Sequence, residues 1–435
     1  MVDLLYANDT RGHYPASWYA ATTTPLDAFA PLEGAATADV CIIGAGYTGL
    51  SAALHLAKAG RRVTVLEAQR IGFGASGRNG GQLGSGQRVD QEDLEAMVGF
   101  DKARTLWEMG EDAKALVKGL IADHNIDCHL KPGVAWTASR ARDVQHLHEY
   151  AKHLQTRYNY DQIEVLDYHA SQALCPSPDY KGAIVDMGAA HLHPLAFALG
   201  LARAAVAAGV TFHEQSRVTR LDHGDKVTVH TDKGQVTADH VILACNGYLS
   251  GLAQSVNARV MPINNFIVAT EPLGARVQDV LTRDIAIADS RFVVNYFRVS
   301  HDQRLLFGGG ESYGYRFPKD IAAVVRKPME IVFPHLKDVR IDYAWGGTLG
   351  ITMKRFPYLT RVAPNVLSAS GYSGHGVGTA THAGQLMAHA IQGDGDGFDT
   401  MRMIPTPAFP GGGALRTPLL ILAMTWYALR DRISI

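Results

Sequence analysis

The sequence of 435 residues is poor in cysteine and has almost no excess charge. Its four cysteines, Cys41, Cys128, Cys175 and Cys245, stand apart and form no CxxC or Cys/His spacing, so neither a metal site nor a disulfide framework is expected. Isolated thiols are typical of a reducing compartment and favour a cytoplasmic protein. Lysine and arginine number 41 against 42 acidic residues, which argues against a nucleic-acid-binding protein.

Long apolar runs are also missing. The N-terminus has no basic stretch followed by an apolar one, so we expect no signal peptide. The most apolar late run covers 418–429 and is too short to span a bilayer, which needs about 20 residues. We expect this tail to pack on the body of the protein or on a second subunit of a homodimer, with contact to a membrane surface as the lesser alternative.

Glycine, in contrast, is abundant at 44 of 435 residues, above the usual ~7%. The first glycine cluster, 44–49, reads GAGYTG and lies between a predicted buried strand at 38–43 and a predicted helix at 47–60. In such a turn Gly44 permits the sharp bend, Gly46 lets backbone approach a pyrophosphate, and Gly49 lets the helix pack on the strand. The helix N-terminus then offers N–H groups to the phosphates.

An acidic residue completes this pattern. Glu67 ends the next predicted strand, at 61–67, where a carboxylate can accept hydrogen bonds from ribose hydroxyls. The unit therefore predicts dinucleotide binding, and the acid disfavours NADP because it would repel a 2′-phosphate. The alternative is a glycine-rich turn without a ligand.

Three further segments favour FAD over NAD. The small-residue loop IGFGASGRNGGQ at 71–82 can wrap closely around a ligand. The strand HVILACNG at 240–247 can close the dinucleotide cleft, and GYSGHGVGTATHAG at 371–384 is a second glycine turn opening a helix. That helix N-terminus would stabilise the negative charge of a reduced flavin. A flexible surface loop and a structural turn are the alternatives for the two glycine segments.

The order of the elements predicts an α/β protein in which a Rossmann-like FAD-binding domain is interleaved with an α+β substrate domain on a mixed or antiparallel sheet. Helices are expected at about 91–123, 140–157, 195–209 and 320–333. The predicted division is an N-terminal surface arm at 1–35, an FAD-binding domain at 36–95, 178–255 and 350–395, a substrate domain at 96–177 and 256–349, and a C-terminal tail at 396–435.

Several segments together resemble the D-amino-acid-oxidase-like superfamily of FAD oxidoreductases. They are ADVCIIGAGYTGLSAALHLAKAG, VTVLEAQRIGFGASGRNGGQL, GAAHLHPLAFALG, RLLFGGG, GYSGHGV and the tail FPGGGALRTPLL…YALRDR. Within the superfamily the chain is similar to the bacterial γ-glutamylputrescine oxidoreductases, which are amine oxidases of polyamine catabolism. The resemblance runs from about residue 13 to the C-terminus.

The resemblance implies which residues hold FAD. The ADP half would contact Gly44, Gly46, Tyr47, Thr48, Gly49, Glu67 and Ala68, with the backbone of Val218 at the adenine. The ribityl chain and pyrimidine edge would follow Ser76, Arg78, Asn79, Gly80, Gly81 and Gln82. Gly374, His375, Gly376 and Val377 would lie at the pyrimidine end of the flavin.

Departures from the superfamily pattern bear on the substrate. Sarcosine oxidases carry a carboxylate-binding lysine where Gly378 stands. Glycine and D-amino-acid oxidases place an arginine near the position of 348–350, and Arg355 is only close to it in sequence. Both absences argue against an α-amino acid substrate. Covalent members attach FAD through a late cysteine; because Cys245 is the last cysteine here, FAD should be non-covalent.

The resemblance implies oxidation of a small-molecule amine such as γ-glutamylputrescine. A neutral amine would lose hydride from its neighbouring carbon to flavin N5, and the imine would hydrolyse to aldehyde and ammonia. Molecular oxygen is the expected acceptor, giving hydrogen peroxide. An apolar pocket would lower the pKa of the amine from about 10, so the protein need not supply a base.

Candidate catalytic or pocket residues are Tyr296, Arg298, Trp345, Tyr372 and His375. The aromatic rings could line an amine cage through cation–π contacts, or Tyr296 and Trp345 could be ordinary sheet core. Arg298 could bind a remote carboxylate such as that of a γ-glutamyl group, or be a surface charge on a strand. His375 could orient the flavin, satisfy its turn, or act as an acid or base.

The pair at His191 and His193 resembles a zinc pair but lacks partners, so we interpret it as a structural turn and expect no metal. Three other functions stay open at this point. One is a secondary-amine or N-methyl-amino-acid oxidase of the sarcosine type. Another is a non-catalytic flavin-binding electron-transfer partner, and the third is an NAD dehydrogenase.

Overall fold

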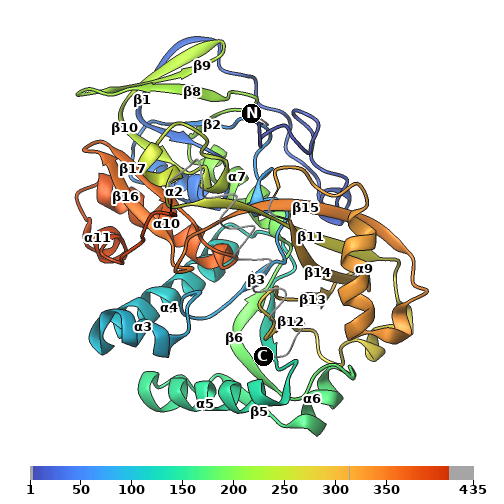
Figure 1. Cartoon of the computed structure of the whole chain (residues 1–435). Helices are drawn as coiled ribbons and strands as arrows, with labels where there is room; N and C mark the ends of the chain where they lie inside the picture. The colour runs from blue at the N-terminus through green and yellow to red at the C-terminus, as the bar shows by residue number, and fades with distance from the viewer. Residues whose placement is uncertain (1–2, 313, 411–435) are drawn as a thin grey trace.

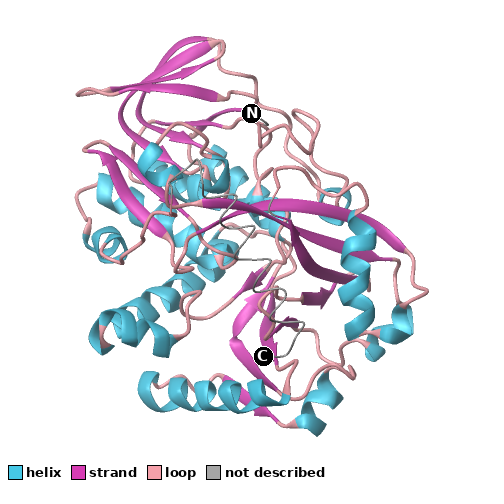
Figure 2. Cartoon of the chain, viewed as in Figure 1, coloured by secondary structure: helices cyan, strands magenta, loops and turns pink. Residues whose placement is uncertain are grey.

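Two β-sheets built from interleaved stretches of chain organise the structure, a computed structural model that describes residues 3–312 and 314–410. Figure 1 shows one sheet with its helices at the upper left and the other at the lower right. Figure 2 shows that helices flank both sheets. This arrangement confirms the predicted α/β class with a second, mixed sheet.

The first sheet has eight strands in the order β16-β17-β10-β1-β2-β7, with β9 pairing β10 and β8 pairing β9. Its central pairs are parallel, while β16–β17 and β8–β9 are antiparallel. The strands are β1 (Gly34–Ile43), β2 (Val63–Leu66), β7 (Thr211–His213), β8 (Val218–Asp222), β9 (Val227–Thr231), β10 (Gly234–Leu243), β16 (Tyr358–Ala363) and β17 (Val366–Ser370).

The register of the central strands brings their carboxyl ends to one level. Ile43 at the end of β1 pairs with Leu66 of β2 and with Leu243 of β10. In parallel sheets ligands bind beyond this edge. The turns that follow these strands, including the glycine turn after Ile43, therefore gather in one place.

The second sheet has nine strands, in the order β15-β11-β14-β13-β12-β4-β6-β3 with β5 on β6. The pair β12–β4 is parallel and the other pairs are antiparallel. The strands are β3 (Gln82–Leu83), β4 (Lys131–Thr137), β5 (Ile163–Leu166), β6 (Ala183–His191), β11 (Met261–Thr270), β12 (Ala286–Asp289), β13 (Tyr296–Val299), β14 (Leu305–Ser312) and β15 (Ile341–Ile351).

Helices follow the predicted pattern with one interruption. The expected helix at 91–123 is divided at Gly99, whose φ of 81° ends one helix and precedes the next. The helices are α1 (Trp18–Ala21), α2 (Tyr47–Lys58), α3 (Gln91–Val98), α4 (Phe100–Asp123), α5 (Ala141–Tyr158), α6 (Tyr168–Leu174), α7 (Pro194–Ala207), α8 (Gln254–Asn257), α9 (Ile321–Val332), α10 (Gly376–Ile391) and α11 (Asp396–Arg402). Within the described residues, none is both long and apolar enough to cross a membrane.

The predicted domain boundaries stay a prediction, although two strands lie in a different sheet from the one that division implies. The predicted FAD-binding domain includes 82–83 and 183–191, whereas the strands at these residues, β3 and β6, belong to the second sheet. The reason is pairing: β6 forms antiparallel ladders with β3, β4 and β5. Of the predicted tail, 396–410 is described, and the apolar run at 418–429 lies outside the described residues.

The N-terminal arm was predicted to pack on the surface, and this is wrong for its aromatic pair. Trp18 and Tyr19 in α1 are only 1% and 0% exposed. The Tyr19 ring lies 4.9 Å from the His193 ring and 5.1 Å from the Trp345 ring, between centroids. Large aromatic side chains remove much apolar surface from water, so these two residues of the arm are part of the core.

Replacing Tyr19 with alanine should therefore lower the free energy of unfolding by about 3–5 kcal/mol, as other truncations of large buried aromatics do. The matched control is Tyr168→Ala, whose side chain is 47% exposed and whose loss should change stability by less than about 0.5 kcal/mol. Thermal denaturation of both variants measures the difference. Equal melting temperatures would contradict the placement of the arm in the core.

Candidate active site

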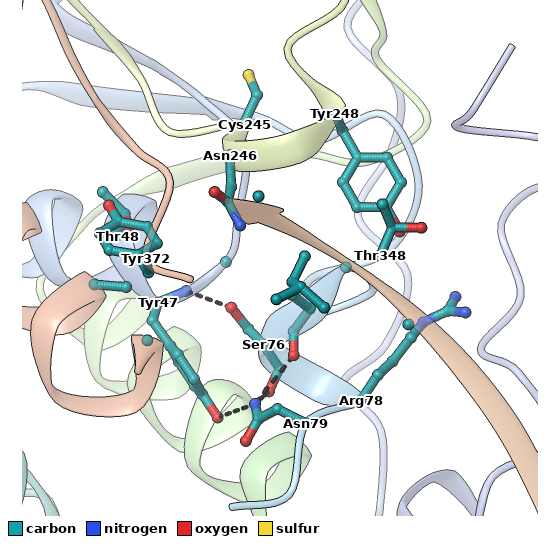
Figure 3. A pocket seen from close by; sticks show the side chains of 18 of the residues that line it. Tyr47, Thr48, Ser76, Arg78, Asn79, Cys245, Asn246, Tyr248, Thr348 and Tyr372 are labelled. Atoms are coloured by element: carbon teal, nitrogen blue, oxygen red, sulfur yellow. Dashed lines mark hydrogen bonds between the residues drawn. The ribbon is translucent and has the colours of Figure 1, made fainter. Parts of the chain in front are cut away.

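A cavity of about 590 Å³ runs from the carboxyl edge of the first sheet to the face of the second. Its first part is lined by the turns after β1, β2 and β10 and by the loop that follows β2. Its second part is lined by β4, β11, β13 and β14 and by the turn before α10. Figure 3 shows the side chains at the first part, including Tyr47, Ser76 and Asn246.

Close backbone contacts shape the glycine turn after β1. A Cβ atom on Gly44, which has a φ of +104°, would lie 2.8 Å from the carbonyl oxygen of Ala244. A Cβ on Gly49 would overlap the carbonyl oxygen of Gly44. Gly46 is the N-cap of α2 and carries no side-chain cap. The surroundings of Gly44 and Gly49 match the sharp bend and the helix packing predicted for them, and Gly49 is not part of the cavity lining. The approach of a pyrophosphate to Gly46 stays a prediction.

The loop after β2 folds back onto the start of α2 through side-chain hydrogen bonds (Figure 3). Tyr47 N donates to Ser76 Oγ at 2.9 Å. Asn79 Nδ2 donates to the carbonyl oxygens of Ala75 and Ser76, each at 3.0 Å, and Asn79 Oδ1 accepts from Gly81 N at 2.8 Å. These bonds hold the loop as a second wall of the cavity against the glycine turn.

Glu67 has a structural task that sequence reasoning missed. Its carboxylate accepts a hydrogen bond from Ala45 N at 2.8 Å and another from Gln69 N at 2.9 Å. Burial raises the pKa of this carboxyl to about 7, although the backbone donors act in the opposite direction. Glu67 still lines the cavity beside Ala68 and Val218, so it both braces the glycine turn and presents its edge to a ligand.

Arg78 is buried at the wall of the cavity. Its Nε donates to Phe73 O at 2.7 Å, and its Nη1 donates to Gly346 O at 3.1 Å and pairs with Asp9 at 3.0 Å. Its Nη2 is buried and has no hydrogen-bond partner among the described residues. A buried donor without a partner is costly, and a ligand in the adjoining cavity would supply the acceptor.

The second glycine turn lies across the cavity from the first. Ser373 and Gly374 have φ values of 53° and 91°, which turn the chain sharply into α10. The hydroxyls of Tyr372 and Thr48 hydrogen-bond at 2.7 Å, so the turn is tied to α2. His375 Nε2 lies 3.3 Å from Gly86 O; a carbonyl oxygen only accepts, so the ring proton lies on Nε2.

His375 is neutral at physiological pH. Burial, and secondarily the nearby Arg88 guanidinium, lower its pKa to about 4. A neutral imidazole can accept a hydrogen bond at Nδ1 but cannot supply a permanent positive charge. This environment favours the predicted role of orienting a flavin over the predicted role of an acid or base, which would need a pKa near neutrality.

The five candidate pocket residues separate into two groups. Tyr296, Tyr372 and His375 line the cavity. Trp345 and Arg298 lie behind its wall, where Trp345 Nε1 donates to Arg78 O at 3.1 Å and Arg298 Nε donates to Gly80 O at 3.2 Å. The cage role for Trp345 and the surface alternative for Arg298 are therefore wrong: Trp345 is core, and Arg298 is only 4% exposed.

The predicted cofactor residues meet at the cavity with two exceptions. Gly49 and Gly81 are absent from its lining, and Gly81 serves a turn with a φ of +76°. The cavity lining contains Gly44, Gly46, Tyr47, Thr48, Glu67, Ala68, Ser76, Arg78, Asn79, Gly80, Gln82, Val218, Gly374, His375, Gly376 and Val377.

Other lining residues were not found from the sequence. They come from the N-terminal arm, from loops and from strands of the second sheet, where no motif marks them. Asn246 lies within the predicted strand at 240–247, and Thr348 and Arg355 lie at or near the position where the resemblance implies an arginine in other members, but none of them was predicted to line the site. The set includes Leu5, Arg88, Asn246, Tyr248, Asn265, Phe292, Glu311, Thr348 and Arg355.

His193, one of the histidine pair, serves as the N-cap of α7. Its Nδ1 accepts from Ala196 N at 3.1 Å, and its Nε2 lies 3.1 Å from Thr22 Oγ1. The part of the chain that the structure describes has no group of three His, Cys, Asp or Glu side chains able to hold a metal ion.

Comparison with known families shows the family to which the chain belongs. The family model described as FAD dependent oxidoreductase matches residues 39–390. The chain belongs to the FAD-dependent oxidoreductases. Both glycine turns fall inside the matched range, and so do both sheets except for the first residues of β1.

Relatives in this family cover nearly the whole chain. The γ-glutamylputrescine oxidoreductase of Escherichia coli (strain K12) is 40% identical over 97% of this chain and 99% of its own. The protein named "probable oxidoreductase OrdL" of Rhizobium meliloti (strain 1021) is 42% identical over 96% of this chain and 97% of its own. Among solved structures, glycine oxidase from Geobacillus kaustophilus has the same fold, with a TM-score of 0.68 at 21% identity, covering 82% of this chain and 95% of that one.

The residues present fit FAD. Gly46, the N-cap of α2, has no side chain of its own, and Ser76, whose Oγ accepts from Tyr47 N, lies beside it. Both residues border the space that a diphosphate at this helix end would take. The buried Nη2 of Arg78 has no hydrogen-bond partner among the described residues. FAD fits these residues because it carries a diphosphate for the helix end and a ring system with several hydrogen-bond acceptors.

Replacing Gly49 with alanine should abolish FAD retention, because the new Cβ would overlap the carbonyl oxygen of Gly44 and displace the glycine turn. Gly119→Ala is the matched control, since it is also a helical glycine but has no atom within 4 Å of an added Cβ. The measurement is flavin absorbance per mole of purified protein. Full flavin content in Gly49→Ala would contradict the geometry of the turn.

Proposed function

We propose that the protein is an FAD-dependent amine oxidase that acts on a primary amine, γ-glutamylputrescine or a related polyamine derivative. The observation that carries this proposal is the 40% identity, over nearly the full length of both chains, to an enzyme named γ-glutamylputrescine oxidoreductase. The cavity agrees with it. Gly378 in α10 packs against Leu83 and leaves no lysine at that position, and Thr348 donates to Asn264 Oδ1 where other members place an arginine.

The reaction converts R–CH2–NH2, O2 and water to R–CHO, NH3 and H2O2. The glycine turn after β1, the loop after β2 and the turn before α10 would hold FAD, which would supply a hydride acceptor and return two electrons to oxygen. The nitrogen lone pair forms the C=N bond of the imine as hydride leaves, and water then releases ammonia and the aldehyde. The protein must therefore bind the amine in its neutral form.

The cavity lining favours a neutral amine. Tyr296 OH donates to Asn265 Oδ1 at 2.5 Å, and burial raises the pKa of its phenol, so it stays uncharged. His375 is neutral because burial lowers its pKa, so neither side chain places a charge beside a bound amine. These residues orient the substrate and remove it from water without acting as a base.

The flavin is proposed to be non-covalent. Cys245 is the cysteine at the cavity, and its Sγ donates to Ile43 O at 3.3 Å. Burial raises the pKa of this thiol to about 12, and the thiolate is the nucleophilic form. Acid precipitation of the holoprotein should therefore leave all flavin in the supernatant, measured by absorbance; yellow colour retained in the washed pellet would contradict this.

Anaerobic stopped-flow mixing tests the proposed activity. γ-Glutamylputrescine should bleach the flavin absorbance, and in air it should yield aldehyde, ammonia and hydrogen peroxide in equal amounts. A higher kcat/KM for sarcosine or D-alanine than for γ-glutamylputrescine would overturn the proposed substrate and indicate a secondary-amine or amino-acid oxidase. Flavin that no amine reduces would favour a non-catalytic electron-transfer partner.

The pH dependence of kcat/KM distinguishes titration of the substrate amine from titration of His375. Because only the neutral amine reacts, kcat/KM should rise about tenfold per pH unit on the acid side. His375 has a folded-state pKa near 4 and stays neutral across that limb, so the limb should persist in His375→Asn whatever the absolute rate. Steady-state kinetics between pH 6 and 10 measure it. A limb that vanishes in His375→Asn would make this histidine the titrating group.

A further inference from the structure

Two arginine side chains line the cavity without an acidic partner. Arg88 follows β3 and Arg355 lies between β15 and β16. Within 3–312 and 314–410, no hydrogen bond or ion pair is formed by either guanidinium; that of Arg355 lies 5.7 Å from the centroid of the Phe292 ring. Other arginines around the cavity, such as Arg78, are paired.

The two guanidinium groups act on each other. The pKa of Arg88 is lowered by burial and then by the charge of Arg355, while Asp90 and Glu311 act in the opposite direction. Bringing two cations together in a partly buried cavity costs free energy that an anion between them would offset. The arrangement is suited to a carboxylate, which arginine binds through two parallel hydrogen bonds.

A negative charge lies at the same end of the cavity. Glu311 on β14 pairs across the sheet with Asn265 on β11, and Asn265 accepts the hydrogen bond of Tyr296. Glu311 is close enough to contribute to the raised pKa of the Tyr296 phenol and to act on Arg88. Two cations that can bind one carboxylate, and one anion that can bind one ammonium, suit the zwitterionic group of an α-amino acid.

We propose that Arg88 and Arg355 bind the α-carboxylate, and Glu311 the α-ammonium, of the γ-glutamyl head of the substrate. This specificity site rests on the proposed function, because it places the head at one end of the cavity and leaves the distal primary amine to react. It takes over the role considered for Arg298, whose guanidinium lies behind Gly80 and outside the lining.

The first test measures binding without turnover. γ-Glutamyl-n-butylamide keeps the amino-acid head but lacks the oxidisable amine, and isothermal titration calorimetry on FAD-loaded protein gives its Kd. Arg88→Gln and Arg355→Gln should each weaken binding by about tenfold or more, as for the loss of a charged hydrogen bond. Arg88→Lys should restore part of the affinity. Arg203→Gln, an exposed change on α7, should leave Kd unchanged.

The second test compares two oxidisable substrates. The ratio of kcat/KM for γ-glutamylputrescine to that for N-acetylputrescine, which has no amino-acid head, should fall about tenfold or more in both glutamine variants. Glu311→Gln should lower the same ratio, but not the affinity for N-glutarylputrescine, which lacks the α-ammonium. Flavin content and melting temperature establish that each variant is folded.

The outcomes of these two tests can overturn the specificity site and the proposed function independently. Wild-type protein that fails to bind the butylamide, or variants whose ratio and Kd match the wild type, would overturn the specificity site even if γ-glutamylputrescine is oxidised. Arginine-dependent binding of the butylamide, with no flavin reduction by γ-glutamylputrescine, would uphold the site and overturn the proposed function.

Discussion

The close approach of backbone to backbone at the end of β1 is the constraint on which the rest of the structure depends. Gly44 lies against the carbonyl of Ala244, and Gly49 lies against the carbonyl of Gly44. No side chain fits at either point. This packing brings the ends of β1, β2 and β10 together, and the buried carboxylate of Glu67 then secures the turn through Ala45 N. The cavity that we propose for FAD begins at this edge.

Charge is distributed unevenly along the cavity. Near the second glycine turn the titratable groups are uncharged: His375 has a depressed pKa and Tyr296 a raised one. Arg88, Arg355 and Glu311 are charged side chains of the same lining, where Arg88 acts on His375 and Glu311 acts on Tyr296. A long substrate with one neutral amine and one zwitterionic end would place the zwitterion against the charged side chains, which joins the proposed reaction to the proposed specificity.

Much of the FAD site could be predicted because its chemistry is local in sequence. A tight turn, a helix N-terminus and a strand-end acid need glycine or acid at particular spacings, and GAGYTG with Glu67 has them. The substrate end could not be predicted in this way. Arg298 and Trp345 were reasonable choices on strands, yet β13 and β15 direct both side chains behind the wall. No spacing distinguishes them from Tyr296, which enters the cavity.

The sequence by itself determined the α/β class, the positions of most helices and strands, and the two glycine turns, because these follow from hydrophobic periodicity and from the need for residues without side chains. Only the tertiary structure decided that the N-terminal arm enters the core, that β3 and β6 join the second sheet, and that Arg88 and Arg355 share a cavity. Those contacts join residues far apart in the chain, and they are selected by strand pairing and packing that local patterns do not encode.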